Sequence, residues 1–192
     1  MCSFRSPPNG RLTAFVEGHV PGAVNVPVDG SSFATKSAFV LPAGVAVALH
    51  AEGREQAELA ARRLRAIGIL DLVGRLESPA TSERLEPVAA DEVERLLETG
   101  EAEIVDVREK DERDAGYIPG TRHVPYRMIR AAAGTFDGKP VVTICSTGAR
   151  AAVAASVLAS EGVDARPVLD GGVADWEREG QALVHFRRCG GH

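Results

Sequence analysis

The sequence predicts an α/β protein made of two tandem copies of one plan, each a central, mostly parallel sheet flanked by helices. The first observation is a repeated motif: Gly-His-Val-Pro-Gly at residues 18–22 recurs as Gly-Tyr-Ile-Pro-Gly at residues 116–120. The second is that an apolar run, a short turn and a helical stretch follow the motif in both copies. Strands that alternate with helices in this order are typical of an open parallel sheet.

The first copy is predicted to be truncated and to span residues 1–76. Little chain precedes its motif, and residues 3–5 stand where the second copy has residues 106–108. We therefore expect the first strand to be shortened, with no helix before it. The apolar run at residues 45–49 predicts the next strand, and a helix is expected from the following turn to about Ile67.

The second copy has every element of the plan and is expected over residues 88–192. A polar stretch that contains proline predicts a linker at residues 77–87. Asp91 is a candidate N-cap for a helix whose apolar spacing comes from Val93, Leu96 and Leu97. Strands are expected at residues 103–107 and 141–144, and a second helix is expected to run to about Ser160.

The composition is that of an ordinary globular protein, with 44% hydrophobic residues, 26% charged residues and a formal net charge of −5. This acidity argues against broad binding to nucleic acid, which favours a basic face. No run approaches the ~20 apolar residues of a membrane span, and the start lacks the apolar core of a signal peptide. We therefore expect a cytoplasmic protein without nucleic-acid or membrane partners.

The three cysteines differ in their surroundings. An odd count without regular spacing does not indicate a disulfide framework, and no Cys/His cluster predicts a metal site. Cys2 and Cys189 lie in terminal segments, where a thiol is usually incidental. Cys145 stands where an apolar strand ends and a helix begins. This position makes Cys145 the candidate nucleophile.

The residues after Cys145 favour the binding of an anion. Four small residues follow it: Ser146, Thr147, Gly148 and Ala149. Small side chains let successive backbone N–H groups turn inward as an anion-binding nest, and the next helix adds the positive end of its dipole. Arg150 contributes a formal charge and aligned donors. Such a loop stabilises a thiolate, a persulfide or an oxyanion, although a cysteine at the end of a strand is also a common core residue.

Four segments together resemble the rhodanese homology domain, in order, over residues 88–180. They are Asp-Val-Arg at residues 106–108, the motif at residues 116–120, the loop at residues 145–150 and Asp-Gly-Gly-Val-Ala-Asp-Trp at residues 170–176. The combination is specific, whereas no single piece is. The resemblance implies a parallel sheet wrapped by helices and a cysteine that cycles between thiol and persulfide without a metal or organic cofactor. Tyr117 is a departure, because the family usually has a structural histidine there.

The resemblance assigns roles by position. Cys145 would carry the persulfide, and the backbone N–H groups of residues 146–150 would cradle its sulfur. Arg150 would bind the anionic donor or brace the loop. Asp106 and Arg108 would support the loop from behind, with a plain surface ion pair as the alternative. Trp176 is expected to pack in the core rather than to contact substrate.

The first copy resembles the same family over residues 13–74 but lacks its chemistry. His50 stands at the cysteine position, and Glu55 stands where Arg150 would align, so that a carboxylate opposes anion binding. We expect an inactive packing or docking partner with a structural histidine. Residues 32–35 make the pair similar to the C-terminal part of fusions headed by a metallo-β-lactamase-fold persulfide dioxygenase. The expected protein partner is a domain of that fold or a second copy of this chain.

Three functions stay open on the sequence. The preferred one is a sulfurtransferase that moves sulfane sulfur from thiosulfate, a polysulfide or a persulfide to a thiol or cyanide through Cys145. Cysteine phosphatases related to this fold have one more residue between cysteine and arginine, and Ala151 stands at that place. The third is a non-catalytic docking module, which would not need the cysteine. Because Arg150 is the sole cation of the loop, a persulfide donor is favoured over thiosulfate.

Overall fold

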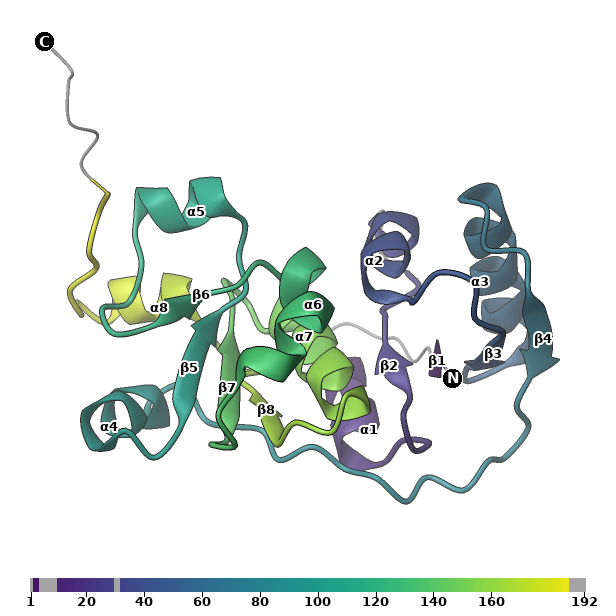
Figure 1. Ribbon diagram of the computed structural model, residues 1–192, viewed down its shortest axis with the longest axis horizontal. Coiled ribbons are helices and arrows are strands. Elements are labelled where there is room, and N and C mark those ends of the chain that lie inside the picture. Colours follow the sequence, from purple (N-terminus) through teal and green to yellow (C-terminus); the bar gives the residue numbers. More distant parts are fainter. Residues whose placement is uncertain (1, 4–9, 30–31, 187–192) are drawn as a thin grey trace, which may run out of the picture.

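Two four-stranded parallel sheets with the same strand order form the framework of the protein (Figure 1). The computed structural model describes residues 2–3, 10–29 and 32–186, with side chains from residue 14 onward. The first sheet has the order β2-β1-β3-β4 and the second has the order β6-β5-β7-β8. The strands are β1 (Cys2–Ser3), β2 (Val24–Asn25), β3 (Val47–His50), β4 (Leu72–Arg75), β5 (Glu103–Asp106), β6 (Arg122–His123), β7 (Val141–Ile144) and β8 (Ala165–Pro167).

Helices follow the strands as the repeated motif predicts. They are α1 (Gly10–Glu17), α2 (Phe33–Val40), α3 (Arg54–Ala66), α4 (Glu92–Thr99), α5 (Lys110–Ala115), α6 (Ile129–Ala132), α7 (Ala149–Ser160) and α8 (Val173–Arg178), with 3₁₀ turns η1 (Tyr126–Met128) and η2 (Ala133–Thr135). The expected α/β class is confirmed. We call the part around the first sheet the first unit and the part from residue 88 onward the second unit.

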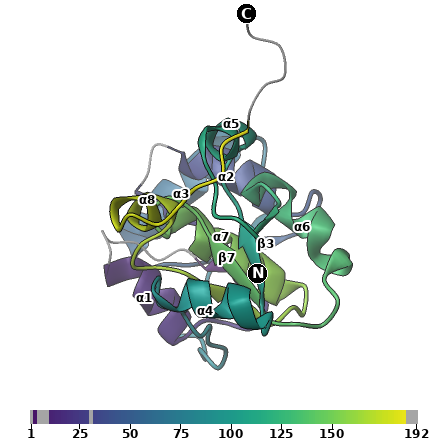
Figure 2. The ribbon, with the colours of Figure 1, turned by 90° about the vertical axis from the view of Figure 1, so that its left-hand side faces the viewer.

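The second sheet is covered on both faces. Helices α6 and α8 lie on opposite sides of it (Figure 2), and each belongs to a different apolar cluster. The side chains of β7 are therefore all buried, which explains why this strand is a continuous apolar run around Thr143. Helix α4 begins directly after Asp91, as expected, although that side chain makes no capping hydrogen bond.

Helix α7 joins the two units. Its residues 151–158 are all buried, because one side packs on β7 and β8 and another packs on β2 of the first unit. The backbone N–H of Asn25 in β2 donates to the Ser156 hydroxyl across this boundary at 2.9 Å. A single apolar cluster contains Phe33 and Leu64 from the first unit and Val153 from α7. The units therefore share one core.

The first strand is short, as expected, but it is present. Cys2 and Ser3 pair in parallel with both β2 and β3, so β1 takes the central place that β5 takes in the second sheet. Phe4, Arg5 and Cys189 lie outside the described residues. Strand β4 and helix α1 have no counterpart in the sequence analysis. The expected linker carries no helix, and it is tied to the first unit where His19 and Glu83 exchange backbone hydrogen bonds of 2.9 and 3.2 Å.

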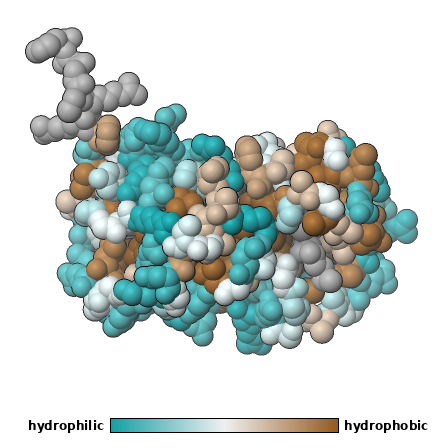
Figure 3. All heavy atoms as spheres, in the orientation of Figure 1, coloured by the Kyte–Doolittle hydropathy of each residue, from teal (hydrophilic) through white to brown (hydrophobic). Residues whose placement is uncertain are grey.

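The surface of the first unit carries exposed apolar side chains at its outer end (Figure 3), where Leu70 and Val73 are 72% and 64% exposed. No helix within the described ranges is both long and apolar enough to span a lipid bilayer. The same residues contain no group of three or more His, Cys, Asp or Glu side chains placed to hold a metal ion.

Candidate functional site

Cys145 lies at the carboxyl end of β7, where the chain turns into α7. Cys145 is 1% exposed. It forms no disulfide bond with any residue that the structure describes. The turn closes at Gly148, which has a φ of 86° and stands directly before the first residue of α7. The first N–H groups of a helix have no partner within the helix, so the start of α7 leaves backbone donors a few residues after Cys145.

Two glycines let a second segment lie against this loop. A Cβ on Gly148 would come within 2.2 Å of the Leu169 carbonyl oxygen, and one on Gly172 would come within 2.0 Å of the Cys145 carbonyl oxygen. The Val173 N–H donates to that same Cys145 oxygen at 3.0 Å. The Asp-Gly-Gly segment at residues 170–172 is therefore part of the wall of the site, because only glycine fits this close approach.

Arg150 points back to the loop and meets a carboxylate there. Glu112 of α5 accepts hydrogen bonds from both terminal nitrogens of Arg150, one of them at 2.6 Å to Nη2, and accepts a third from the Ser146 hydroxyl at 3.1 Å. The hydrogen bond from Arg150 holds the pKa of Glu112 down at about 2. In return, the hydrogen bond to Glu112 raises the pKa of Arg150, and interaction with Cys145 raises it further. Glu112 thus neutralises the cation of the loop.

Asp106 and Arg108 form a buried pair behind the site. Their side chains are 1% and 7% exposed, and Arg108 Nη2 contacts Asp106 Oδ2 at 2.7 Å, so the alternative of a surface ion pair is wrong. Arg108 Nη2 also donates to the Gly116 carbonyl at 2.8 Å. The pair therefore braces the turn of the repeated motif, while the Val107 N–H links this strand end to Ile144 at 2.9 Å.

The other residues singled out in the sequence differ in their surroundings. Trp176 is half-buried against the cluster between α4, α8 and the sheet, as a packing role requires. The Tyr117 ring lies under the Arg113 guanidinium at 4.0 Å. His50 is the last residue of β3 and is 8% exposed, whereas Cys145 follows the last residue of β7, and Glu55 lies exposed in the first turn of α3. The first unit therefore has the frame of the site without its thiol.

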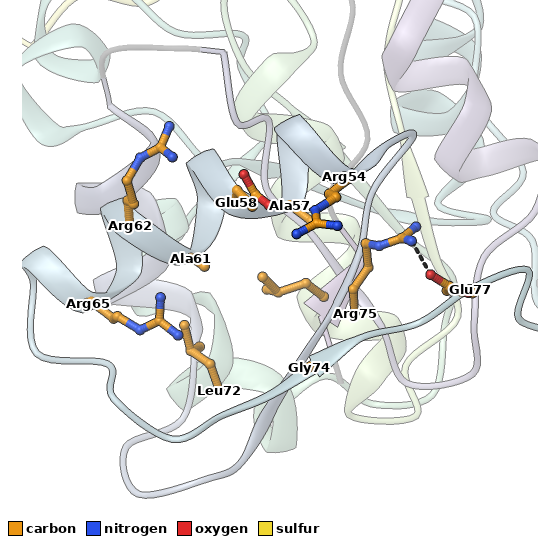
Figure 4. A pocket seen from close by; sticks show the side chains of 11 residues that line it. Arg54, Ala57, Glu58, Ala61, Arg62, Arg65, Leu72, Gly74, Arg75 and Glu77 are labelled. Carbon is orange, nitrogen blue, oxygen red and sulfur yellow. Dashed lines mark hydrogen bonds and ion pairs between the residues drawn. The ribbon is translucent and has the colours of Figure 1, made fainter.

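A hollow of about 470 Å³ in the first unit is separate from the Cys145 site (Figure 4). It lies between α3 and β4, with an apolar floor that includes Leu49 and Leu72. Arginines surround the floor, and two of them pair with carboxylates: Arg54 with Glu58 at 2.8 Å, and Arg75 with Glu77. All its lining residues come from the first unit.

Comparisons with known proteins match about half of the chain. A family model described as rhodanese-like domain matches residues 89–179. The thiosulfate sulfurtransferase GlpE of Pseudomonas aeruginosa is 31% identical over 97 residues, which is 50% of this chain and 86% of that protein.

The chain belongs to the rhodanese-like family.

Solved structures resemble the chain over different shares of its length. The human single-domain sulfurtransferase TSTD1 is 27% identical, with a TM-score of 0.42, and covers 48% of this chain and 96% of that one. A rhodanese-like domain protein of Staphylococcus aureus is 31% identical, with a TM-score of 0.44, and covers 48% and 91%. A thiosulfate sulfurtransferase from Pseudomonas aeruginosa, at 23% identity and a TM-score of 0.44, covers 96% of this chain and 40% of that one.

The rhodanese-like site contains one residue that the sequence analysis missed. Glu112 lies four residues before Gly116 and contacts two residues of the loop, Ser146 and Arg150. Its position just ahead of the repeated motif was the one feature of the sequence that could have pointed to Glu112 as a site residue. The carboxylate and the loop are 38 positions apart in the chain, so no local spacing connects them.

Proposed function

We propose that this rhodanese-like chain transfers sulfane sulfur through a persulfide on Cys145. The observation that carries the proposal is the combination of a buried cysteine, a glycine-closed turn and the N-terminus of α7 at one point. The N–H groups of residues 146–150 offer donors to a sulfur anion, and Arg150, held by Glu112, keeps the turn in shape. Asp106 and Arg108 support this arrangement from behind.

The reaction proceeds in two displacements. In the first, the Cys145 thiolate attacks the outer sulfur of the donor. The donor's S–S bond breaks, and its inner sulfur leaves with the electron pair, as sulfite from thiosulfate or as a thiolate from a persulfide. In the second, cyanide or an acceptor thiolate attacks the outer sulfur of the Cys145 persulfide. The new S–S bond breaks, and Cys145 returns to the thiolate with no net oxidation or reduction of the protein.

The donor that the loop favours is a low-molecular-weight persulfide. Arg150 is already neutralised by Glu112, so the loop itself presents little net positive charge to the thiosulfate dianion. A persulfide that carries one charged sulfur needs less compensation. We further propose that the first unit performs no sulfur transfer, since His50 replaces the cysteine and Glu55 replaces the arginine.

Mass spectrometry after incubation with a sulfur donor tests this function. Glutathione persulfide or thiosulfate should add one sulfur mass to the peptide that contains Cys145, and cyanide should remove it as thiocyanate. Cys145→Ser should abolish turnover, whereas Cys189→Ser should keep most of it. Sulfur found mainly on Cys189 would contradict the assignment. So would hydrolysis of an aryl phosphate that exceeds sulfur transfer and is lost in Cys145→Ser.

A further inference from the structure

Helix α2 of the first unit is fixed against the second unit. The Phe39 ring meets the Tyr126 ring edge-on, with 6.3 Å between their centroids. The Val40 carbonyl accepts hydrogen bonds from Nε and Nη2 of Arg130 at 3.2 and 3.0 Å. Helix α2 therefore has one face on η1 and α6, two elements that belong to the second unit (Figure 1).

Lys36 lies one turn earlier on the same face of α2. Residues three and four apart are neighbours on a helix, so the positions of Phe39 and Val40 direct Lys36 toward the second unit. Its side chain is half-buried there. Burial lowers the pKa of Lys36, and the charge of Arg150 lowers it further, whereas the Cys145 thiolate raises it. The contacts of η1 place this helix near the end of β7. Helix α2 packs on η1, the Tyr126 N–H of η1 donates to the Val107 carbonyl at 3.0 Å, and the Val107 N–H donates to the Ile144 carbonyl, one residue before Cys145.

Arg150 and Lys36 differ in whether a carboxylate already pairs with them. Arg150 is held by both carboxylate oxygens of Glu112. Lys36 has no carboxylate within ion-pair distance among the described residues, and none of their carboxylates contributes to its pKa shift. The positive charge of Lys36 is therefore available to an incoming anion.

We infer that Lys36 binds the anionic group of the sulfur donor, so that the site is shared between the two units. This inference rests on the proposed function. When the thiolate attacks thiosulfate, two negatively charged groups must approach each other, and an ammonium group beside them offsets the repulsion. The sulfite that leaves carries the electron pair away as an anion. An ammonium group is compact and has three donors that can rotate, so it can bind the oxygens of a sulfonate-like group or of a carboxylate.

The kinetics of the full-length chain with thiosulfate and cyanide test the inference. Lys36→Met keeps the length of the side chain and removes its charge, and Lys36→Arg keeps the charge. Lys139→Met is the matched control, because Lys139 donates to the Gly100 carbonyl at 3.1 Å on the exposed surface. Circular dichroism and thermal unfolding establish that each variant is folded.

Lys36→Met should lower kcat/KM for thiosulfate at least tenfold, mostly through KM, while Lys36→Arg and Lys139→Met stay within threefold of the parent. The parent's kcat/KM should fall as ionic strength rises, and Lys36→Met should respond less. An unchanged KM in folded Lys36→Met, or a lower kcat that Lys36→Arg does not restore, would overturn the inference. If the parent accepts no sulfur on Cys145 from any donor, the proposed function itself fails.

Discussion

The Glu112 carboxylate holds the Arg150 guanidinium with both of its oxygens, and one of these oxygens also accepts a hydrogen bond from Ser146. Glu112 belongs to α5, ahead of the repeated motif, whereas Ser146 and Arg150 belong to the loop that carries Cys145. One side chain therefore ties α5 to two positions of the candidate site. Arg150 in turn donates to the Ser146 hydroxyl at 3.3 Å, which closes the network.

Glu112→Gln should lower kcat/KM for sulfur transfer by about tenfold. This is the lower end of the loss seen when a residue that hydrogen-bonds a metal ligand is replaced, and Glu112 supports Arg150 in a comparable way. A glutamine has one acceptor oxygen in place of two, and its NH₂ faces the Arg150 donors, so the loop loses its fixed shape. Steady-state kinetics with thiosulfate measure the effect. Glu92→Gln is the control, because Glu92 pairs with Arg95 on the surface at 2.7 Å. Unchanged kinetics in Glu112→Gln would show that the loop keeps its shape unaided.

Acid should remove the contribution of Glu112 to stability. Hydrogen bonding from Arg150 lowers the pKa of Glu112 from its ordinary value of 4.5 to about 2. Because the folded pKa lies below the unfolded one, this contribution is complete above pH 4.5 and is lost as the pH falls toward 2. The difference in Tm between the parent chain and Glu112→Gln should therefore be larger at pH 6 than at pH 3. A difference that stays constant over this range would contradict the prediction.

Gly172→Ala should abolish sulfur transfer. Its Cβ would lie 2.0 Å from the Cys145 carbonyl oxygen and 2.8 Å from the Ser146 carbonyl carbon, and neither backbone atom has room to retreat without moving the loop. We expect at least a hundredfold loss of turnover together with a lower Tm. Gly134→Ala is the matched control, because its Cβ would meet nothing within 4 Å. Full turnover in Gly172→Ala would show that residues 170–172 do not form the wall of the site.

Ser156→Ala should destabilise the whole chain by about 1–3 kcal/mol, the cost of leaving a buried donor unpaired. The Ser156 hydroxyl accepts the hydrogen bond from the Asn25 N–H, and both residues are 1% exposed or less. Denaturant unfolding should show one transition, because α7 lies in the core of both units. Ser160→Ala, which removes a partly buried hydroxyl bonded within the same helix, should cost less. Two separate transitions would contradict the shared core.

Local sequence patterns predicted the elements that carry Cys145. Apolar residues at β7 and small residues at α7 indicate a buried strand and a buried helix, and both elements lie where the pattern places them. Strand β4 was missed because its four residues include Gly74 and most of them are exposed, so no apolar run stands out. The repeated motif indicated that both units follow one plan, and the two identical strand orders agree with it.

The sequence by itself determined the position of the thiol, because a strand end, a glycine turn and a helix start are consecutive in the chain at residues 144–149. Only the tertiary structure decided which charges surround that thiol. Glu112 neutralises Arg150 across 38 positions, and Phe39 and Val40 anchor the helix that carries Lys36 on the second unit. Charges so far apart in sequence act on one another only after folding brings them within a few ångströms, since water and salt screen them in the unfolded chain.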